Sequence, residues 1–528
     1  MKSRLLTRLA LFLSLSAMAC DTGPKEGEEH IYYAEKLNHE DKKVRENAMK
    51  NLSQLKDKRS VPGLNKALGN GHAEIKPELV KLVNDMADPS SVKPMIDAID
   101  WRAGAGRDKT GKMLAVANER IAKGLGKLAK PDNKEAIDAL IKLADSNHLN
   151  TQLAAVVSLG QLKAAAAVDQ LLLVADGSSN NFMVKNATIA LGKIADARAV
   201  PVLVKLLFFE RAGVSFYAEA SYSLFQIGKP AVPALIETYK GTHKGLTRLH
   251  LDEGVRKTKA IIILADIENS PEVEKLALEL AKYAGQGGYV ARREAQTVLG
   301  RMGVKAAVPI LMENYDNVDM SQSAYTLNAL ERIGDRRMLK DLTNMTTQAG
   351  YMKQCTSGQG SEKQCKKHES AIRKTRLATL SRLGNKDTMT MVKEILEVEK
   401  PTNKKLLKEA QAAKGRLEAN VACDGKDLVC WMDQLKAKNP RTREKAAYEL
   451  MWRKNSDSID ALVGQLGDED NEARFPAILA LWRMIPNQNN DKIVAHIDGI
   501  LKKEKGQTQY VRINEDLKRL RIKLARGY

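Results

Sequence analysis

Apolar residues recur at intervals of three and four along most of the chain, and the first clear example spans residues 44–64. Val44, Ala48, Leu52 and Leu55 fall on one face of a helix, with polar residues between them. A turn follows, and a Val-Pro-x-Leu sequence then begins a second apolar stripe. Proline is favoured in the first turn of a helix, because its missing N–H has no partner there and its φ is already helical. The pattern predicts two helices joined by a short turn.

The same hairpin recurs along the chain. Three segments align without gaps, at residues 51–64, 190–203 and 298–311, and a fourth at 223–235 is one residue shorter. All four contain Val-Pro-x-Leu, and the successive valines are 139, 32 and 76 residues apart, near multiples of a repeat of roughly 35 residues. Neither helix of a unit can bury its stripe alone, so the units must stack. We therefore expect an all-α protein, an α-solenoid of helical hairpins.

Weaker copies of the first helix extend the solenoid to about twelve repeats. They are expected near residues 75–83, 114–128, 149–162, 184–194, 216–227, 255–267, 290–302, 324–333, 371–383, 442–452 and 473–484. Residues 346–370 and 398–426 break the period. The expected organisation is an N-terminal array over 37–345, an interrupted region with a Cys loop and helices over 346–426, and a C-terminal array over 427–528 that ends in a basic capping helix.

The repeat resembles a known family in its residues. Asp41 to Leu64 follow the pattern D-x-x-V-R-x-x-A-x-x-x-L-x-x-L-x-D-x-R-x-V-P-x-L. This pattern is similar to the HEAT repeat, and in particular to the shorter HEAT-like repeats also found in phycobilin (PBS) lyases. The resemblance implies stacked hairpins whose second helices line a concave binding face. It concerns the repeat and not an active site, so it implies no lyase activity. Tetratricopeptide repeats are the alternative, but their Trp-Leu-Gly-Tyr signature is missing.

The N-terminus has the form of a secretory signal peptide. Lys2, Arg4 and Arg8 form a positive segment, and an apolar run of 11 residues follows over 9–19. A membrane-spanning helix needs about 20 apolar residues, so this run is too short to span a bilayer. We therefore expect residues 1–19 to be removed after export.

Cys20 directly follows this run. A small residue followed by cysteine resembles the lipobox of bacterial lipoproteins, although Ala17 stands where leucine is usual. The resemblance implies that Cys20 is lipidated, with acyl chains such as palmitate, and that 20–36 forms a flexible tether. The chain would then be lipid-anchored on the periplasmic side of the bacterial cell envelope, with the inner or outer membrane undecided. An ordinary signal peptide with an incidental cysteine is the alternative.

Four cysteines remain after Cys20, namely Cys355, Cys365, Cys423 and Cys430. An even number in an exported chain indicates disulfides. Three connectivities are open, and the two pairs of near neighbours are the simplest. The spacing does not fit zinc, for which the paired cysteines stand two to four residues apart. We therefore expect structural disulfides and no metal site.

Positive charge is the main compositional bias, because 85 Lys and Arg stand against 65 Asp and Glu in 528 residues. Three groups are candidates for binding an anion or partner: Lys240, Lys244, Arg248, Arg256, Lys257 and Lys259; Arg373, Lys374 and Arg376; and Arg519, Arg521 and Lys523. A basic solenoid suits an anionic partner. A solvated surface of paired charges and a contact with anionic lipid headgroups are the other interpretations of these groups.

Motifs that would name a reaction are missing. The sequence has no HExxH, GxSxG or P-loop pattern, and its eight histidines are scattered. We therefore expect no enzyme activity and no cofactor. The hypothesis is a membrane-anchored HEAT-repeat lipoprotein that acts as a non-catalytic scaffold for an envelope protein or peptide, or for an anionic glycan or lipid surface. A nucleic-acid-binding protein of the DNA glycosylase type is the alternative if the signal is misread, and a lyase-type enzyme is a third.

Overall fold

The computed structural model describes residues 23–527 with short gaps. The gaps are at residues 71, 104–107, 317–319, 358–360, 386–387, 398–403, 424, 426 and 486–489. The predicted signal peptide and Cys20 lie outside the described residues.

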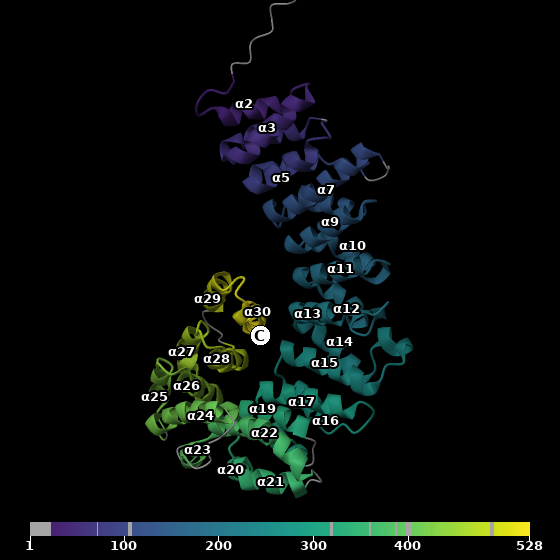
Figure 1. The fold of residues 1–528 in the computed structure, drawn as a ribbon. Coiled ribbons are helices and arrows are strands. Elements are labelled where there is room, and N and C mark those ends of the chain that lie inside the picture. The colour runs from purple at the N-terminus through teal and green to yellow at the C-terminus, as the bar shows by residue number, and fades with distance from the viewer. Residues whose placement is uncertain are drawn as a thin grey trace, which may run out of the picture. The chain divides into compact units, whose positions relative to one another are not determined.

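Long first helices and shorter second helices alternate through the N-terminal part of the chain (Figure 1). The first helices are α3(Lys42–Leu55), α5(Lys76–Met86), α7(Lys109–Leu128), α9(Leu149–Gln161), α11(Asn181–Ile194), α13(Tyr217–Ile227), α15(Glu253–Ile267), α17(Gly288–Met302) and α19(Met320–Ile333). The second helices are α4(Val61–Leu68), α6(Val92–Asp97), α8(Lys134–Leu143), α10(Val168–Gly177), α12(Val200–Leu206), α14(Val232–Lys240), α16(Pro271–Ala281) and α18(Val308–Asp316). The predicted α-solenoid of helical hairpins is confirmed.

Short 3-10 turns precede most second helices. They are η1(Lys58–Ser60), η2(Pro89–Ser91), η3(Ala165–Ala167), η4(Ala197–Ala199), η5(Lys229–Ala231) and η7(Lys305–Ala307), and η6(Lys244–Leu249) lies between α14 and α15. In the described residues, strands are limited to the antiparallel pair β1(Glu210–Arg211) and β2(Val214–Ser215). The repeat therefore departs from pure helix mainly at its turns.

Helices after α19 continue the chain with less regular spacing. They are α20(Leu339–Thr346), α21(Gln348–Ser357), α22(Glu362–Leu383), α23(Thr388–Glu397), α24(Lys404–Cys423), α25(Leu428–Gln434), α26(Pro440–Arg453), α27(Ile459–Gln465) after η8(Ser456–Ser458), α28(Asn471–Met484), α29(Asn490–Lys503) and α30(Val511–Arg526) after η9(Thr508–Tyr510). Helices α21 to α24 occupy the predicted interruption of the repeat.

The Asp-x-Arg of the repeat fixes the turn between its two helices. The Asp57 side chain accepts from the backbone N–H of Arg59 at 2.9 Å and pairs with its guanidinium at 2.6 Å. Asp196 and Arg198 repeat both contacts, at 2.9 and 2.8 Å. An aspartate in this position satisfies N–H groups that the first turn leaves without partners. The turn is thus built locally by residues that recur in the sequence.

Helix α2(Glu29–Lys36) lies where a flexible tether was expected up to residue 36. Ala34 and Leu37 are buried. A side-chain Cβ added at Gly63 would lie 2.4 Å from the Ala34 Cβ, so α2 packs directly on α4. The expected tether is therefore too long at its C-terminal end, because its last residues have an apolar face that the first hairpin covers.

The helices form two compact units, one up to Ser223 and one from Leu224, with the boundary inside α13. In unit 1, neighbouring first helices are joined by buried hydroxyl groups. The hydroxyls of Thr151 and Ser158 in α9 donate to backbone carbonyls of α7, at 3.1 and 2.8 Å. A Cβ added at Gly160 would lie 2.8 Å from the Cα of Ala190 in α11, so the first helices are in direct contact.

In unit 2, the C-terminal helices meet the C-terminal ends of the first helices. Lys523 of α30 donates to the carbonyl of Ile267 at 3.0 Å, at the end of α15. Arg483 of α28 donates to the carbonyls of Gly300 and Arg301 at 2.6 and 2.8 Å, near the end of α17. The carbonyls in the last turn of a helix lack intrahelical partners and carry partial negative charge, so buried cations suit them.

Carbonyl groups at the C-terminal ends of α19 and α22 also accept hydrogen bonds from the C-terminal array. The indole N–H of Trp452 in α26 donates to the carbonyl of Glu331 at 3.1 Å, in the last turn of α19. Lys445 of the same helix donates to the carbonyl of Gly384 at 3.0 Å, just beyond α22. The C-terminal array thus contacts α15, α17, α19 and α22 in turn (Figure 1). In unit 2 the first helices therefore face the C-terminal array, whereas the family resemblance implied that the second helices line the inner face.

A buried charge network joins α19, α22, α24 and α26. Glu444 is fully buried and accepts from Nε of Arg382 at 2.6 Å and from Nε of Arg416 at 3.0 Å. Glu331 is also buried, and it accepts from the Tyr448 hydroxyl at 2.7 Å and from Arg382 at 3.2 Å. Arg382 therefore links two carboxylates from helices that are far apart in the sequence.

Acid is expected to weaken unit 2 through Glu444. Burial disfavours its charged form, but Arg382, Arg416 and Arg441 outweigh burial and hold the pKa of Glu444 below its usual value of 4.5. The folded carboxyl group binds a proton less tightly than the unfolded one. Its stabilising contribution is therefore complete above about pH 4.5 and is lost as the pH falls through the lower folded pKa.

Urea unfolding followed by tryptophan fluorescence checks this expectation, because three of the four tryptophans lie in unit 2. We expect the free energy of unfolding to fall between about pH 5 and pH 3, and more steeply than in Glu444→Gln. Equal slopes in the two proteins would contradict the assignment.

Candidate anion-binding site

The first basic group from the sequence lies around α14 and α15, and much of its charge is paired. Lys240 contacts Glu272 at 3.0 Å, and Lys257 contacts Glu253 and Glu279 at 2.8 and 3.0 Å. These residues line a cavity of about 640 Å³ with as many glutamates as lysines. Its charge is balanced, so it does not select an anion.

Of the other four residues of this group, two have partners inside the fold and two are exposed to solvent. Arg256 donates to the carbonyls of Thr238 and Tyr239 at the end of α14. Lys259 is half-buried and has a partner of its own. Lys244 and Arg248 are exposed. The six residues predicted as one binding group are therefore not one surface.

The second group is largely structural. Arg373 and Arg376 of α22 are buried. Arg373 donates to the carbonyl of Thr346 at 2.8 Å, and Arg376 donates to that of Met345 at 2.7 Å. Both arginines therefore donate hydrogen bonds to carbonyl groups at the C-terminal end of α20. Lys374, between them in the sequence, is exposed.

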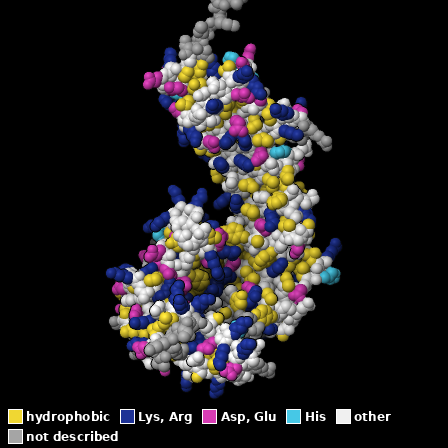
Figure 2. Space-filling view, in the orientation of Figure 1, with side chains coloured by type: hydrophobic (Ala, Val, Ile, Leu, Met, Phe, Trp, Pro, Cys, Tyr) yellow, Lys and Arg dark blue, Asp and Glu magenta, His cyan; other side chains and the backbone are white. Residues whose placement is uncertain are grey.

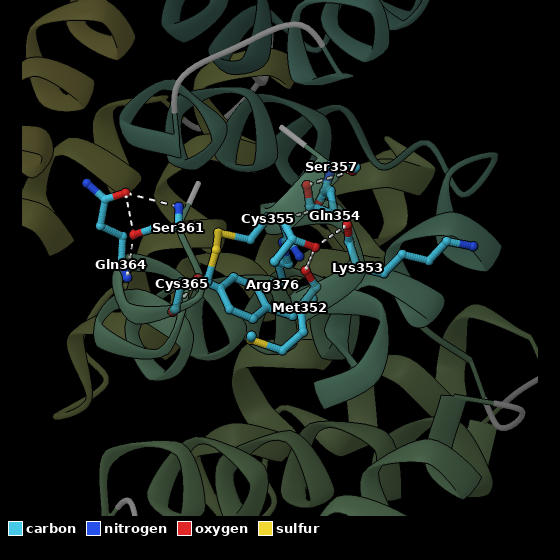
Figure 3. The surroundings of a disulfide bond; sticks show 11 residues. Met352, Lys353, Gln354, Cys355, Ser357, Ser361, Gln364, Cys365 and Arg376 are labelled. Atoms are coloured by element: carbon cyan, nitrogen blue, oxygen red, sulfur yellow. Dashed lines mark hydrogen bonds between the residues drawn. A yellow bond between two sulfur atoms is a disulfide. The ribbon is translucent and has the colours of Figure 1, made fainter. Parts of the chain in front are cut away.

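Arg376 also contacts Gln354, the residue directly before Cys355, which forms a disulfide that joins α21 to α22 (Figure 3). Cys355 and Cys365 have Cα atoms 5.9 Å apart, and Cys423 and Cys430 have Cα atoms 5.7 Å apart. The structure thus joins each cysteine to its near neighbour in the sequence. The first bond closes a short loop inside the region that interrupts the repeat, and the second joins the end of that region to α25 at the start of the C-terminal array.

The third group lies on α30. Arg521 pairs with Asp498 of α29 at 2.8 Å, and Lys523 caps α15. Arg519 contacts Asp266 of α15 at 2.6 Å. Arg519 also lines a cavity between α17, α19, α28 and α30, and this cavity differs from the others in its charge.

This cavity has a volume of about 310 Å³ and lies entirely within unit 2. We call it the arginine pocket, and its lining residues are Thr297, Arg301, Arg332, Phe475, Ile478, Leu479, Trp482, Arg512, Glu515, Asp516 and Arg519. Figure 2 has the orientation of Figure 1. Where α17, α19, α28 and α30 lie, blue basic and yellow apolar side chains meet around a hollow. Four guanidinium groups and two carboxylates line the cavity, together with an apolar wall from α28.

The four arginines differ in their partners. Arg301 and Arg519 each contact one oxygen of the buried Asp266 carboxylate. In the part of the chain that the structure describes, the side chains of Arg332 and Arg512 make no ion pair. Arg332 lies against the Phe475 ring, 5.1 Å from its centroid. Two guanidinium groups of the pocket are thus left to a ligand or to solvent.

Positive charge in this region exceeds what its carboxylates balance. Burial and, after it, the charge of Arg332 together lower the pKa of Arg483 to about 9. Burial and, after it, the charge of Arg301 together lower the pKa of Lys523 to about 8. Burial raises the pKa of Asp516 in spite of the four surrounding arginines. An anion in the pocket would relieve the repulsion among the cations.

Sequence reasoning named Arg519 but missed Arg301, Arg332 and Arg512. A signal for two of them exists in the repeat. Arg301 and Arg332 each occupy the next-to-last position of a first helix, directly before its final apolar residue, and Arg382 occupies the same position in α22. An alignment of the repeats shows that basic residues recur at this position, whereas a search for basic clusters along the chain does not reveal it. Nothing in the sequence brings Arg512 near them.

No helix of the described residues is long and apolar enough to cross a bilayer. No group of three or more His, Cys, Asp or Glu residues in that part of the chain is arranged to hold a metal ion.

Comparison with protein families finds the PBS lyase HEAT-like repeat at residues 44–70 and 185–209. These segments contain the hairpin of α3 and α4 and most of the hairpin of α11 and α12. The two hairpins are therefore similar to the HEAT-like repeat that the sequence pattern indicated. Comparison with curated proteins gives no match.

Several solved helical structures are similar at low identity. The complex of CpcE and CpcF of phycocyanin lyase from Nostoc is 19% identical over 46% of this chain and 86% of that chain, with a TM-score of 0.24. Kap95p with RanGDP is 12% identical over 94% and 66%, with a TM-score of 0.37. Human deoxyhypusine hydroxylase is 16% identical over 58% and 96%, with a TM-score of 0.21. The fold assignment rests on the hairpins themselves, and these likenesses indicate no function.

Proposed function

We propose that this protein is a lipid-anchored, non-catalytic binding protein of the bacterial cell envelope. Its solenoid would hold an envelope protein or peptide through an anionic group. The arginine pocket carries the binding role, because Arg332 and Arg512 face a cavity without an ion pair among the described residues. Arg332 is partly buried, whereas Arg512 is exposed. An unpaired charge at a partly buried position costs stability, and proteins tend to accept that cost where they bind a ligand.

The envelope location rests on the sequence before the solenoid and on the cysteines. The apolar run that ends at Cys20 supports export and lipidation. The pairs Cys355–Cys365 and Cys423–Cys430 support an oxidising compartment, since disulfides are rare in the cytosol. The nucleic-acid alternative needs reduced cysteines and a broad free basic surface. Many of the basic side chains instead pair with carboxylates or helix ends inside the fold.

Replacing Cys20 tests the anchor. In its native host, the wild-type chain is expected in the membrane fraction, with an intact mass that starts at an acylated Cys20 and includes two disulfides. Cys20→Ser is expected to leave the membrane fraction, because two or more acyl chains give stable anchoring and none remain in this variant. The Cys355→Ser, Cys365→Ser double variant is the control and should stay membrane-bound. A full-length wild-type chain with free thiols would contradict the proposal.

Crosslinking in the envelope tests the binding role. Wild-type protein is expected to give a discrete crosslinked product with an envelope protein, and Cys20→Ser is expected to give less of it, because it has lost its position at the membrane. A wild-type chain that gives no product under these conditions would contradict the scaffold role.

A further inference from the structure

We propose that the arginine pocket binds a carboxylate that is directly attached to an apolar group, as in the C-terminal residue of a peptide that ends in an apolar side chain. This inference rests on the proposed binding function and names the chemical group that the solenoid recognises. It follows from the charge, the walls and the size of the pocket.

The charge of the pocket favours an anion with a single charge. Arg332 and Arg512 are available, whereas Arg301 and Arg519 already share Asp266. A guanidinium group offers two parallel N–H donors, which match the two oxygens of a carboxylate. Glu515 and Asp516 also line the pocket, and they would repel a phosphate dianion more strongly than a carboxylate.

The apolar wall requires more than a bare anion. Phe475, Ile478, Leu479 and Trp482 all come from α28 and form one side of the cavity. An aspartate or glutamate side chain has little apolar surface to bury against them. The last residue of a peptide has its own side chain on the carbon that bears the carboxylate, so one ligand residue can meet both the arginines and the wall.

The volume agrees with such a ligand. A cavity of about 310 Å³ lies at the small end of ligand sites and far exceeds the space that a carboxylate needs. The cation–ring contacts place two guanidinium groups against the apolar wall. Arg332 lies over Phe475, and Arg301 lies 5.7 Å from the centroid of the Trp482 ring. Positive charge thus lies next to the apolar wall, where the carboxylate of an apolar residue would arrive.

Calorimetric titration of the full processed chain in detergent tests the proposal. The probe is a pentapeptide Gly-Ser-Gly-Ser-Phe with an acetylated N-terminus and a free C-terminal carboxylate. The same peptide with a C-terminal amide is expected to bind at least about tenfold more weakly, because the amide has no charge to share with the arginines. N-acetylphenylalanine distinguishes the two sources of this chemistry. Tighter binding of the peptide assigns a protein C-terminus, and equal binding assigns a small apolar acid.

Two variants locate the binding. Arg332→Gln and Arg512→Gln break no ion pair of the described fold, and each is expected to weaken binding of the free-carboxylate peptide about tenfold to a hundredfold. Arg521→Gln is the matched control. This variant removes the same charge from the same helix as Arg512→Gln. The Arg521 guanidinium pairs with Asp498, so the affinity of the Arg521→Gln protein for the peptide should stay unchanged. Thermal unfolding of each variant shows that the fold is kept.

The proposal is overturned if the amide binds as well as the acid, if inorganic phosphate binds more tightly than the peptide, or if neither pocket variant loses affinity. These outcomes are separate from a failure of the proposed function. Envelope crosslinking that is equal in Arg332→Gln and wild type would leave the binding role in place and remove the pocket from it.

Discussion

Glu444→Ala is expected to lower the free energy of unfolding of unit 2 by about 3–5 kcal/mol. The side chain is fully buried and accepts from Arg382 and Arg416, which are themselves largely buried. Removing one partner of a buried ion pair leaves the other charges without compensation in a medium that solvates them poorly. The loss is therefore much larger than the net gain that the intact network contributes to folding.

Urea titration at pH 7, with tryptophan fluorescence as the probe, measures this loss. Asp433→Ala is the control, because Asp433 pairs with Lys436 at 3.3 Å with both side chains exposed. Exposed pairs contribute about 0–1 kcal/mol, so the control should lie near wild type. Glu444→Gln should fall between the two, since it keeps the shape and one acceptor. A Glu444→Ala protein as stable as the control would show that the network is solvated.

The repeat itself could be predicted from the sequence because it is built from local contacts. Apolar spacing fixes the helices, and Asp57 with Arg59 fixes the turn between them. Close contacts between neighbouring first helices are also local, since Gly300 lies against Ala329 of the next first helix, where an added Cβ would come within 2.7 Å of its Cα. Each of these features lies within one repeat or between neighbouring repeats.

The binding site could not be predicted in the same way, because its residues come from segments far apart in the sequence. Arg332 of α19 and Arg512 of α30 meet only because the C-terminal array folds back on the first helices. Charge clusters along the chain are a poor guide to such a site. Arg373 and Arg376 belong to one of the basic clusters of the sequence, but they are buried on helix ends. The position of a cation within the repeat is more informative than the local density of cations.

Ending the chain after Gln507, which removes α30, is expected to loosen its neighbours α28 and α29 in unit 2. The missing helix α30 buries Ile513, Leu517, Leu520 and Leu524. Full burial of such a side chain contributes about 1.5–3 kcal/mol, so four of them contribute about 6–12 kcal/mol at most. The basic helix predicted as a polar cap is therefore also a packed part of the core.

The truncation also removes polar contacts that no other element replaces. Lys523 would no longer cap α15, and the buried Asp266 would keep Arg301 but lose Arg519. Hydrogen exchange measures the outcome by segment. We expect faster exchange in α28 and α29, and unchanged exchange in α9 of unit 1, because α9 makes its contacts within that unit. A chain that ends after Arg526 is the control and should exchange like wild type. If α28 stays protected without α30, then Arg483 and the network around Glu444 are sufficient to hold the array.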